Sequence, residues 1–202
     1  MKRVGMFVWN HFTNDARVLR ECTTLSQNGY DVELICIDDP DDPNVKQYEE
    51  FNDHFRVYRM RRYPITLSWL QKIYQLKWPL IPLIIVWGFL VYLLPWIMIP
   101  LSILAILILK TKVRVLWVRG AIILRMIIKG YRGNYDIYHS NDLNTLPQGY
   151  ICAKWRFKKK PLIYDSHAVQ TSRTGYDSPW YKRFEQFFIK RIDSMMVENH
   201  TR

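Results

Sequence analysis

The segment His139-Ser140-Asn141-Asp142 places an imidazole, a hydroxyl, an amide and a carboxylate next to one another after a short apolar run. These side chains both donate and accept hydrogen bonds, as a ligand rich in hydroxyl groups requires. Alternatively, Asp142 and Thr145 only begin the helix that follows, since both residue types favour such positions. The segment predicts a polar binding site in which His139, Asn141 and Asp142 contact the ligand.

A second polar segment, Asn14-Asp15-Ala16-Arg17, joins the first apolar run to a stretch with helical spacing. Unpaired backbone N–H groups at the start of a helix attract anions, and the guanidinium of Arg17 adds a fixed positive charge. No GxGxxG pattern is present, so the dinucleotide-binding type of loop is not indicated. Either Asn14, Asp15 and Arg17 bind an anionic group, or Asn14 caps the helix and Arg17 is a solvated surface residue.

His167 follows a third apolar run, in the string Tyr164-Asp165-Ser166-His167. Its position after a strand favours a functional role over a purely structural one. With His139 and the nearby aspartates it could suggest a metal site, but no HxxxH or HxH spacing supports one. We therefore expect no metal.

Apolar runs of strand length alternate with helix-like stretches along the chain. The expected strands are 2–9, 31–37, 55–60, 136–140, 162–165 and 194–198, and the expected helices are one that Asn14 caps and that ends at Asn28-Gly29, 146–157 and 179–192. This alternation predicts a parallel sheet with helices on both faces, whose ligands lie beyond the carboxyl ends of the strands. Residues 1–63 and 136–202 are expected to form this α/β domain and to bring the three polar segments to one edge.

The composition excludes a disordered chain, because 49% of the 202 residues are hydrophobic. The 29 Lys and Arg residues outnumber the 18 Asp and Glu residues, and no acidic residue lies between Asp53 and Asp136, where 13 of the cations occur. Nucleic-acid-binding proteins interleave basic with aromatic residues or place them on a recognition helix, so we expect no nucleic-acid partner. The three cysteines form no CxxC pair and favour a reducing compartment; they are Cys22, Cys36 and Cys152.

Residues 78–109 form a run of 32 residues without a charge, with Lys and Arg on both sides. A single helix of this length would extend about 48 Å, beyond the roughly 30 Å hydrocarbon core, and Pro95 and Pro100 are expected to interrupt it. Basic flanks on both sides favour the cytoplasmic face for both. We expect a bent hairpin that enters the bilayer and returns; a single tilted crossing and a buried helix are the alternatives.

Residues 113–129 combine apolar residues with four cations, a pattern typical of an amphipathic helix at a membrane interface or of a helix packed on a sheet. Together, residues 64–135 are expected to form a membrane-associated insertion that interrupts the α/β domain. The soluble part would face the cytoplasm.

Three strings resemble the N-terminal domain of retaining glycosyltransferases of the GT-B fold, of the large family 4 type. They are VWNHFTNDARVLRECTTLSQNGYDVELI, YDIYHSNDLNTLPQGYICAKW, and PLIYDSHA followed by a helix and RIDSMMVEN. The resemblance covers nearly all of the soluble part. It implies a Rossmann-like domain that binds the acceptor, while a C-terminal domain binds the nucleotide-sugar donor and catalysis in between needs no cofactor.

The resemblance also implies roles for single residues. His167 matches the catalytic-cleft histidine of a DSHE-like string, although Ala168 replaces the acidic neighbour. Asn14–Val18 match the loop that faces the donor diphosphate, and His139–Asp142 match a cleft-lining HAHD-like string. The family's donor domain would begin close to Arg202, where the sequence ends, so we expect an acceptor-binding half that is inactive without a donor-binding domain.

The resemblance thus implies transfer of a sugar from a nucleotide-sugar, with retention of configuration. The expected membrane attachment favours a lipid-linked acceptor in cell-envelope or exopolysaccharide glycan synthesis, and a second chain with the donor domain as a partner. The alternative is a non-catalytic membrane-bound α/β module, or a truncated remnant, that binds a partner chain or an anionic lipid.

Overall fold

The computed structural model of the chain describes residues 1–75, 80–110, 112–166 and 179–197. Its contacts divide the chain into two units. Residues Met1–Arg61 with Ile123–Arg202 form what we call the α/β unit, and residues Arg62–Ile122 form the helical unit. Helix α5 (Val113–Gly133) contributes residues to both units.

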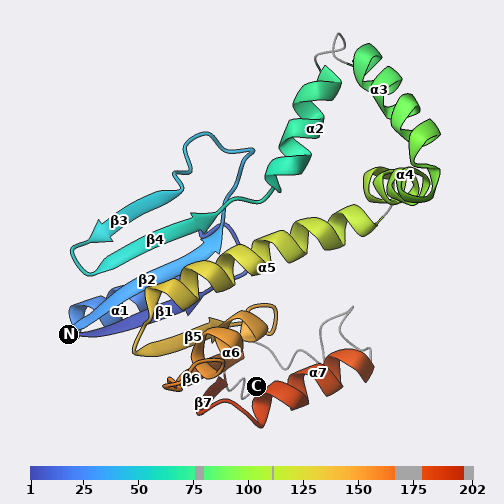
Figure 1. The fold of residues 1–202 in the computed structure, drawn as a ribbon. Coiled ribbons are helices and arrows are strands. Elements are labelled where there is room, and N and C mark those ends of the chain that lie inside the picture. The colour runs from blue at the N-terminus through green and yellow to red at the C-terminus, as the bar shows by residue number, and fades with distance from the viewer. Residues whose placement is uncertain (76–79, 111, 167–178, 198–202) are drawn as a thin grey trace. The chain divides into compact units, whose positions relative to one another are not determined.

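A mostly parallel sheet forms the centre of the α/β unit (Figure 1). Its strands are β1 (Lys2–Phe7), β2 (Tyr30–Ile37), β3 (Tyr48–Asn52), β4 (Phe55–Met60), β5 (Ile137–Asn141), β6 (Leu162–Ser166) and β7 (Ser194–Val197). They lie in the order β3-β4-β2-β1-β5-β6-β7, and every neighbouring pair is parallel apart from β3 and β4. The predicted α/β fold with a parallel sheet is confirmed. The order makes β1, β5 and β6 neighbours, so their carboxyl ends lie side by side.

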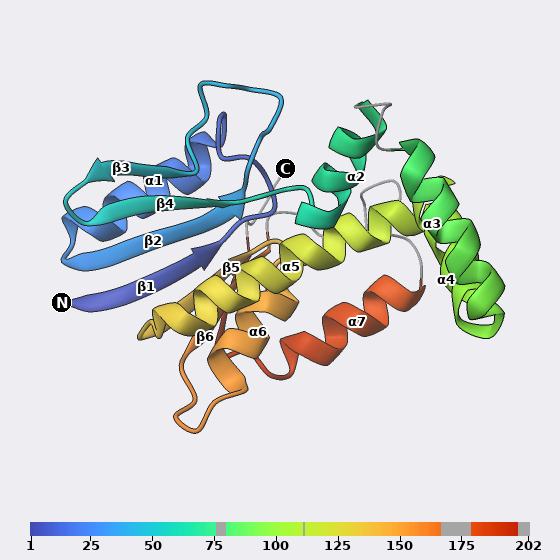
Figure 2. The ribbon, with the colours of Figure 1, turned by 45° about the horizontal axis from the view of Figure 1, so that its top comes forward.

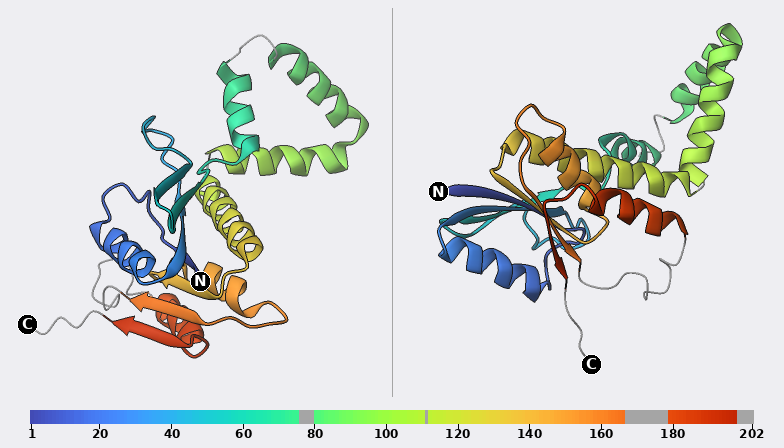
Figure 3. Two further views of the ribbon diagram at one scale, coloured as in Figure 1. Left: turned by 90° about the vertical axis from the view of Figure 1, so that its left-hand side faces the viewer. Right: turned by 90° about the horizontal axis from the view of Figure 1, so that it is seen from below.

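Helices cover both faces of this sheet, as predicted (Figures 2 and 3). Helix α1 (Ala16–Gln27) lies on one face, while the second half of α5, α6 (Leu146–Lys154) and α7 (Pro179–Ile189) lie on the other. This division follows from right-handed crossovers: the chain moves from β1 to β2 in one direction along the sheet, and from β4 through β5 to β7 in the opposite direction.

Strand β3 is not among the predicted strands, because its sequence, YEEFN, shows no apolar alternation. It is an edge strand, antiparallel to β4, and most of its side chains are exposed. Contacts with β4 hold it: the rings of Tyr48 and Tyr58 lie 5.0 Å apart, and the Arg59 guanidinium lies 2.6 Å from the Glu49 carboxylate. These are tertiary contacts, which a local sequence pattern does not reveal.

A buried charge joins α5 to the sheet. Glu33 on β2 is 4% exposed and accepts hydrogen bonds from Arg3 at 3.0 Å, Lys129 at 3.1 Å and the Tyr135 hydroxyl at 2.6 Å. The Lys129 ammonium also lies 3.3 Å from the centre of the Tyr58 ring. Because a buried carboxylate needs such partners, this cluster fixes where the second half of α5 packs.

The helical unit contains α2 (Ile65–Gln75), α3 (Leu80–Leu93), α4 (Pro95–Lys110) and the first part of α5. The chain leaves α3 and enters α4 at Leu94-Pro95, one of the two predicted interruptions, and proline suits the first position of a helix. Pro100 lies inside α4, which continues through it, so this proline removes one backbone hydrogen bond without ending the helix. Trp87 of α3 donates a hydrogen bond to Ser102 of α4 over 3.0 Å.

Helices α3 and α4 are apolar on all sides, and their side chains are mostly exposed. Near the turn between them, Tyr92 is 83% and Trp96 91% exposed. Within the described ranges, no helix has both the length and the hydropathy required to cross a bilayer.

Candidate functional site

The structure brings the polar segments expected at the site to one edge of the sheet. Asp15 and Arg17 lie at the start of α1, after β1, while Asn141 is the last residue of β5 and Asp142 follows it. The register places Phe7 of β1 beside Ser140, and Asn141 beside Asp165 of β6. The carboxyl ends of three adjacent parallel strands therefore supply one polar edge, where ligands of such sheets bind.

The loop between β1 and α1 is fixed by its own hydrogen bonds. Asp15 caps α1, because one carboxylate oxygen accepts the backbone N–H of Val18 at 3.1 Å. The other oxygen accepts the Asn10 amide at 2.8 Å. Asn14 is exposed and is not the cap, so the capping role considered for it is wrong. The Asp15 carboxylate thus satisfies the backbone N–H of the third residue of the helix, the usual role of an N-cap side chain.

Residues 10–15 of this loop line an open hollow of about 310 Å³. Phe12 adopts the left-handed backbone region, with φ of 53°, while its ring is buried against Phe55. Arg17 Nε lies 4.0 Å from the Asp15 carboxylate and its side chain is half-buried. Polar side chains of residues 10–15 thus line this hollow at the start of α1, and the Arg17 guanidinium lies beside one of them, Asp15. The start of a helix and a nearby cation favour an anionic group.

The end of β5 is also rigid. Asn141 is buried, and its amide nitrogen donates to the Phe7 carbonyl of β1 at 3.2 Å, while its amide oxygen has no partner among the described residues. Thr145 is the N-cap residue of α6; its hydroxyl makes no capping hydrogen bond and donates instead to the Asn141 carbonyl at 2.6 Å. Asp142 has a left-handed φ of 70°, a conformation that Asp tolerates better than most residues. These hydrogen bonds fix the conformation of the turn after β5, which holds Asn141 and Asp142 at the edge of the sheet.

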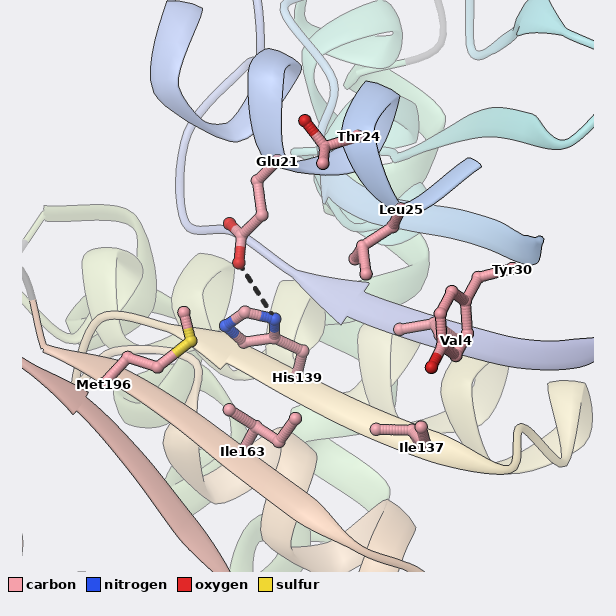
Figure 4. Close-up of a pocket in the computed structure, with 9 residues that line it drawn as sticks. All are labelled: Val4, Glu21, Thr24, Leu25, Tyr30, Ile137, His139, Ile163 and Met196. Carbon is pink, nitrogen blue, oxygen red and sulfur yellow. Dashed lines mark ion pairs between the residues drawn. The ribbon is translucent and has the colours of Figure 1, made fainter. Parts of the chain in front are cut away.

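His139 lies deeper than its neighbours. It is 3% exposed, and its Nδ1 lies 3.3 Å from a carboxylate oxygen of Glu21 on α1 (Figure 4). Both side chains line a hollow of about 390 Å³ between α1 and the sheet, whose other walls include Leu25, Ile163 and Met196. The structure thus places His139 beneath α1, behind the residues that form the polar edge.

Burial sets the protonation of this pair. Burial, with a smaller contribution from Arg17, lowers the pKa of His139 to about 4. Burial, with repulsion from Asp165, raises the pKa of Glu21 to about 7. Between about pH 4 and pH 7 the imidazole is therefore neutral while Glu21 keeps a proton, so the carboxylic O–H is placed to donate to Nδ1.

Glu21 and His139, together with Asp165 on β6, offer ligand atoms that all lie within 4.8 Å of one another. Among the residues that the structure describes, these three are the group with the chemistry to hold a metal ion. The expectation that no metal is needed stays a prediction.

Glu21 was missed in the sequence, although a signal existed. Val18, Cys22 and Leu25 form the apolar stripe of α1, and Glu21 lies on the same side at position i+3 from Val18. A carboxylate on a buried stripe requires a partner inside the domain. The predicted catalytic residue His167 lies outside the described residues; the strand that precedes it ends at Ser166.

Comparison with known proteins bears on the fold. The sequence matches no protein-family model and no curated protein. The solved structure of sucrose-phosphate synthase from Thermosynechococcus elongatus matches 96% of this chain and 42% of its own, with a TM-score of 0.57 and 10% identity. A second structure of that enzyme from the same organism matches 99% of this chain and 91% of its own, with a TM-score of 0.49 and 10% identity.

Sucrose-phosphate synthase is a glycosyltransferase of the GT-B fold. The fold of this chain is glycosyltransferase-like. That part of the expectation from the sequence is confirmed, and at 10% identity the likeness concerns the fold alone. The chain spans less than half the length of the first of these structures.

Proposed function

We propose that the α/β unit is the acceptor-binding domain of a retaining, family 4-like glycosyltransferase. The observation that carries the proposal is that the polar loop at residues 10–17 lies at the same edge of the sheet as the polar ends of β5 and β6, in a fold shared with a glycosyltransferase. A donor-binding domain, in the same polypeptide or in a second chain, completes the cleft.

In this proposal the enzyme transfers a sugar from a nucleotide-sugar to a hydroxyl of the acceptor. The N–H groups at the start of α1 and the Arg17 guanidinium stabilise the diphosphate, while Asn14 and Asp15 shape its loop. Asn141 and Asp142 contact the acceptor or the sugar, with His139 supporting them from behind. His167 lines the reacting cleft, and no metal or other cofactor takes part.

The helical unit supports a lipid-linked acceptor, as used in cell-envelope or exopolysaccharide synthesis. Helices of 14 and 16 residues extend about 21 and 24 Å, so α3 and α4 would enter the roughly 30 Å hydrocarbon core without either one crossing it. Their exposed apolar surfaces favour lipid, and the Lys and Arg residues on both sides favour anionic headgroups at the cytoplasmic face. The α/β unit would then lie on the cytoplasmic side.

A non-catalytic membrane-bound module that binds a partner chain or an anionic lipid is the second candidate. The exposed apolar surfaces of α3 and α4 favour it to the same degree, because such surfaces also mark contacts between proteins.

Activity separates the two candidates. We expect the 202-residue chain alone to show negligible turnover with nucleotide-sugars and polyprenyl-phosphate-linked acceptors, and the chain completed by its donor-binding domain to turn over. His167→Ala in the complete enzyme should lower kcat about 100-fold or more without changing the melting temperature. The matched control is His54→Ala, at the exposed turn between β3 and β4. Full activity of His167→Ala would refute the assignment, and a complete but inactive protein would favour the second candidate.

Membrane attachment is tested separately by vesicle flotation. Ile84 of α3 is exposed, and a charge at a lipid-inserted position costs roughly 3 kcal/mol, so Ile84→Asp should reduce vesicle binding about 100-fold. Leu19→Asp, at an exposed position of α1, is the control and should bind normally. Equal binding of both variants would contradict insertion of α3.

A further inference from the structure

The loop between α6 and β6 exposes two aromatic rings at its tip. Trp155 is 65% exposed and Phe157 111% exposed, which means that Phe157 projects fully into solvent. Lys158 and Lys159 follow directly and are exposed, and no ion pair with another described residue involves them. The loop thus combines apolar rings with unneutralised positive charge.

The polar neighbours of these rings hold the loop in place. Arg156 turns towards the protein: it donates to the Asn134 side chain at 2.5 Å and to the Tyr131 carbonyl at 2.8 Å, and it lies 4.3 Å from the centre of the Tyr131 ring. The side chains of Trp155 and Phe157, on either side of it, point outwards. Their exposure is therefore built into a fixed loop.

Both ends of the loop are anchored as well. The Lys154 ammonium lies 2.5 Å from the Asp193 carboxylate, and the Lys160 ammonium 3.5 Å from that of Asp136. The Lys160 backbone N–H donates to the Ala153 carbonyl at 2.9 Å. A loop held in this way keeps its aromatic tip in one position before any partner binds.

The same side of the sheet continues this chemistry. Figure 3 shows the second half of α5, α6 and α7 together on one side of the sheet. Exposed apolar residues on it include Leu124 and Ile128 of α5 and Phe184 and Phe187 of α7. Exposed cations lie among them at Arg132, Lys182 and Arg183. We call this surface, with the loop 155–159, the basic face.

We propose that the basic face rests on an anionic bilayer, with Trp155 and Phe157 inserted among the headgroups. Aromatic rings favour the depth of the headgroups, and each adjacent Lys or Arg adds attraction to anionic lipid. This inference rests on the proposed function, because it takes lipid as the partner. The residues that carry it belong to the α/β unit and not to the helical unit.

Lipid suits this surface better than nucleic acid does. Single strands bind along a charged groove with stacking platforms, and duplexes take a helix or strand into a groove. On the basic face the rings project from the tip of a loop, which suits insertion into a soft interface. Resting this face on the bilayer places the strands along the membrane plane. The candidate site at their carboxyl ends then opens along the membrane surface, where a lipid-linked acceptor lies.

A fluorophore at position 157 tests the proposal. Phe157→Cys introduces an exposed thiol, while Cys22, Cys36 and Cys152 are buried and burial raises the pKa of each thiol, so an environment-sensitive maleimide dye reacts at the new site. We expect blue-shifted emission, and quenching by spin-labelled lipid, with vesicles of phosphatidylcholine and phosphatidylglycerol. The matched control is a dye at Leu19→Cys on α1, which should stay in water.

Charge reversal gives an independent readout. Lys158→Glu with Lys159→Glu should weaken binding to the anionic vesicles roughly 30-fold and leave binding to pure phosphatidylcholine unchanged. Arg20→Glu with Lys46→Glu, two exposed cations outside the basic face, controls for net charge and should have little effect.

The outcomes separate this inference from the proposed function. If the chain binds vesicles while the dye at position 157 stays in water, the basic face is not a lipid surface, and attachment by the helical unit stands. If the chain binds no vesicles, lipid is not the partner. Insertion of the basic face and attachment by the helical unit are then both refuted. If the charge reversal abolishes a mobility shift of RNA or DNA and spares vesicle binding, the surface binds nucleic acid and the inference is overturned.

Discussion

The imidazole of His139 lies 3.3 Å from the carboxyl group of Glu21, a contact that joins the middle of α1 to the middle of β5. Helix α1 follows the loop at residues 10–15, and β5 ends at Asn141, directly before Asp142. A contact that holds these two elements together therefore fixes the distance between the two parts of the site. His139 is thereby placed to position the site from within the core.

The pH dependence of the free energy of unfolding should contain opposite contributions from Glu21 and His139. The pKa of Glu21 rises from an ordinary 4.5 to about 7, and that of His139 falls from 6.5 to about 4. Between pH 4.5 and 6.5 Glu21 is protonated in the folded state and ionised in the unfolded state. Its contribution to the free energy of unfolding therefore falls as pH rises. His139 acts in the opposite sense, because there the unfolded state binds the extra proton. We expect the two terms largely to cancel in this range.

Replacing one residue of the pair should leave the pH dependence that the other residue contributes to the free energy of unfolding. In Glu21→Gln the free energy of unfolding should fall as pH decreases from 6.5 to 4.5, by as much as about 3 kcal/mol, and in His139→Gln it should rise. Urea unfolding at several pH values measures both slopes. Parallel curves for the wild type and the two variants would show that the pair does not titrate as described.

The packing of α6 on β5 leaves no room for a side chain at Gly149. A Cβ there would collide with Ser140 of β5 and lie 2.9 Å from Leu162 of β6. Gly149→Ala should destabilise the α/β unit by about 1–3 kcal/mol, since a well-packed core resists added atoms. Gly120→Ala is the matched control: its Cβ would meet nothing within 4 Å, and alanine should be neutral or stabilise the helix by roughly 0.5–1 kcal/mol. Thermal unfolding of both variants checks the contrast.

The sequence was informative where local pattern and tertiary structure agree. Alternation of apolar runs and helical stretches predicted six of the strands, both helical layers and the edge that carries Asp15, Asn141 and Asp142. It did not reveal β3, which depends on pairing with β4, or the capping residue of α1, which differs from the predicted one by a single position.

The partner of His139 lay beyond the same reasoning, because Glu21 is distant in the sequence and reaches it only when α1 packs on the sheet. Local periodicity describes one element at a time, whereas contacts between elements depend on crossover direction and register. The same limit applies to Glu33, whose partners come from β1, α5 and the turn before β5.

The charge cluster at Glu33 should resist even a conservative change. Burial alone would raise the pKa of Glu33, but hydrogen bonds from Tyr135 and the charge of Lys129 hold it below its ordinary value. The carboxylate therefore stabilises the fold above pH 4.5, and this contribution is lost as pH falls through the folded-state pKa. Glu33→Gln should cost about 2–4 kcal/mol at pH 7, because it leaves the buried cationic partners without a counter-charge. Asp53→Asn, at an exposed turn, should change the free energy of unfolding by less than about 0.5 kcal/mol.

Metal removal tests the expectation that the site needs no ion. The Glu21 proton already satisfies His139 Nδ1, so the pair is stable without a cation, and exhaustive dialysis against EDTA should leave the melting temperature unchanged. Adding Zn²⁺ or Mn²⁺ should also have no effect. A saturable rise of the melting temperature that His139→Gln abolishes would contradict this, because an ion that binds only the folded state stabilises it as its concentration exceeds the Kd. In that case Glu21, His139 and Asp165 would be the ligands, since their donor atoms lie within 4.8 Å of one another.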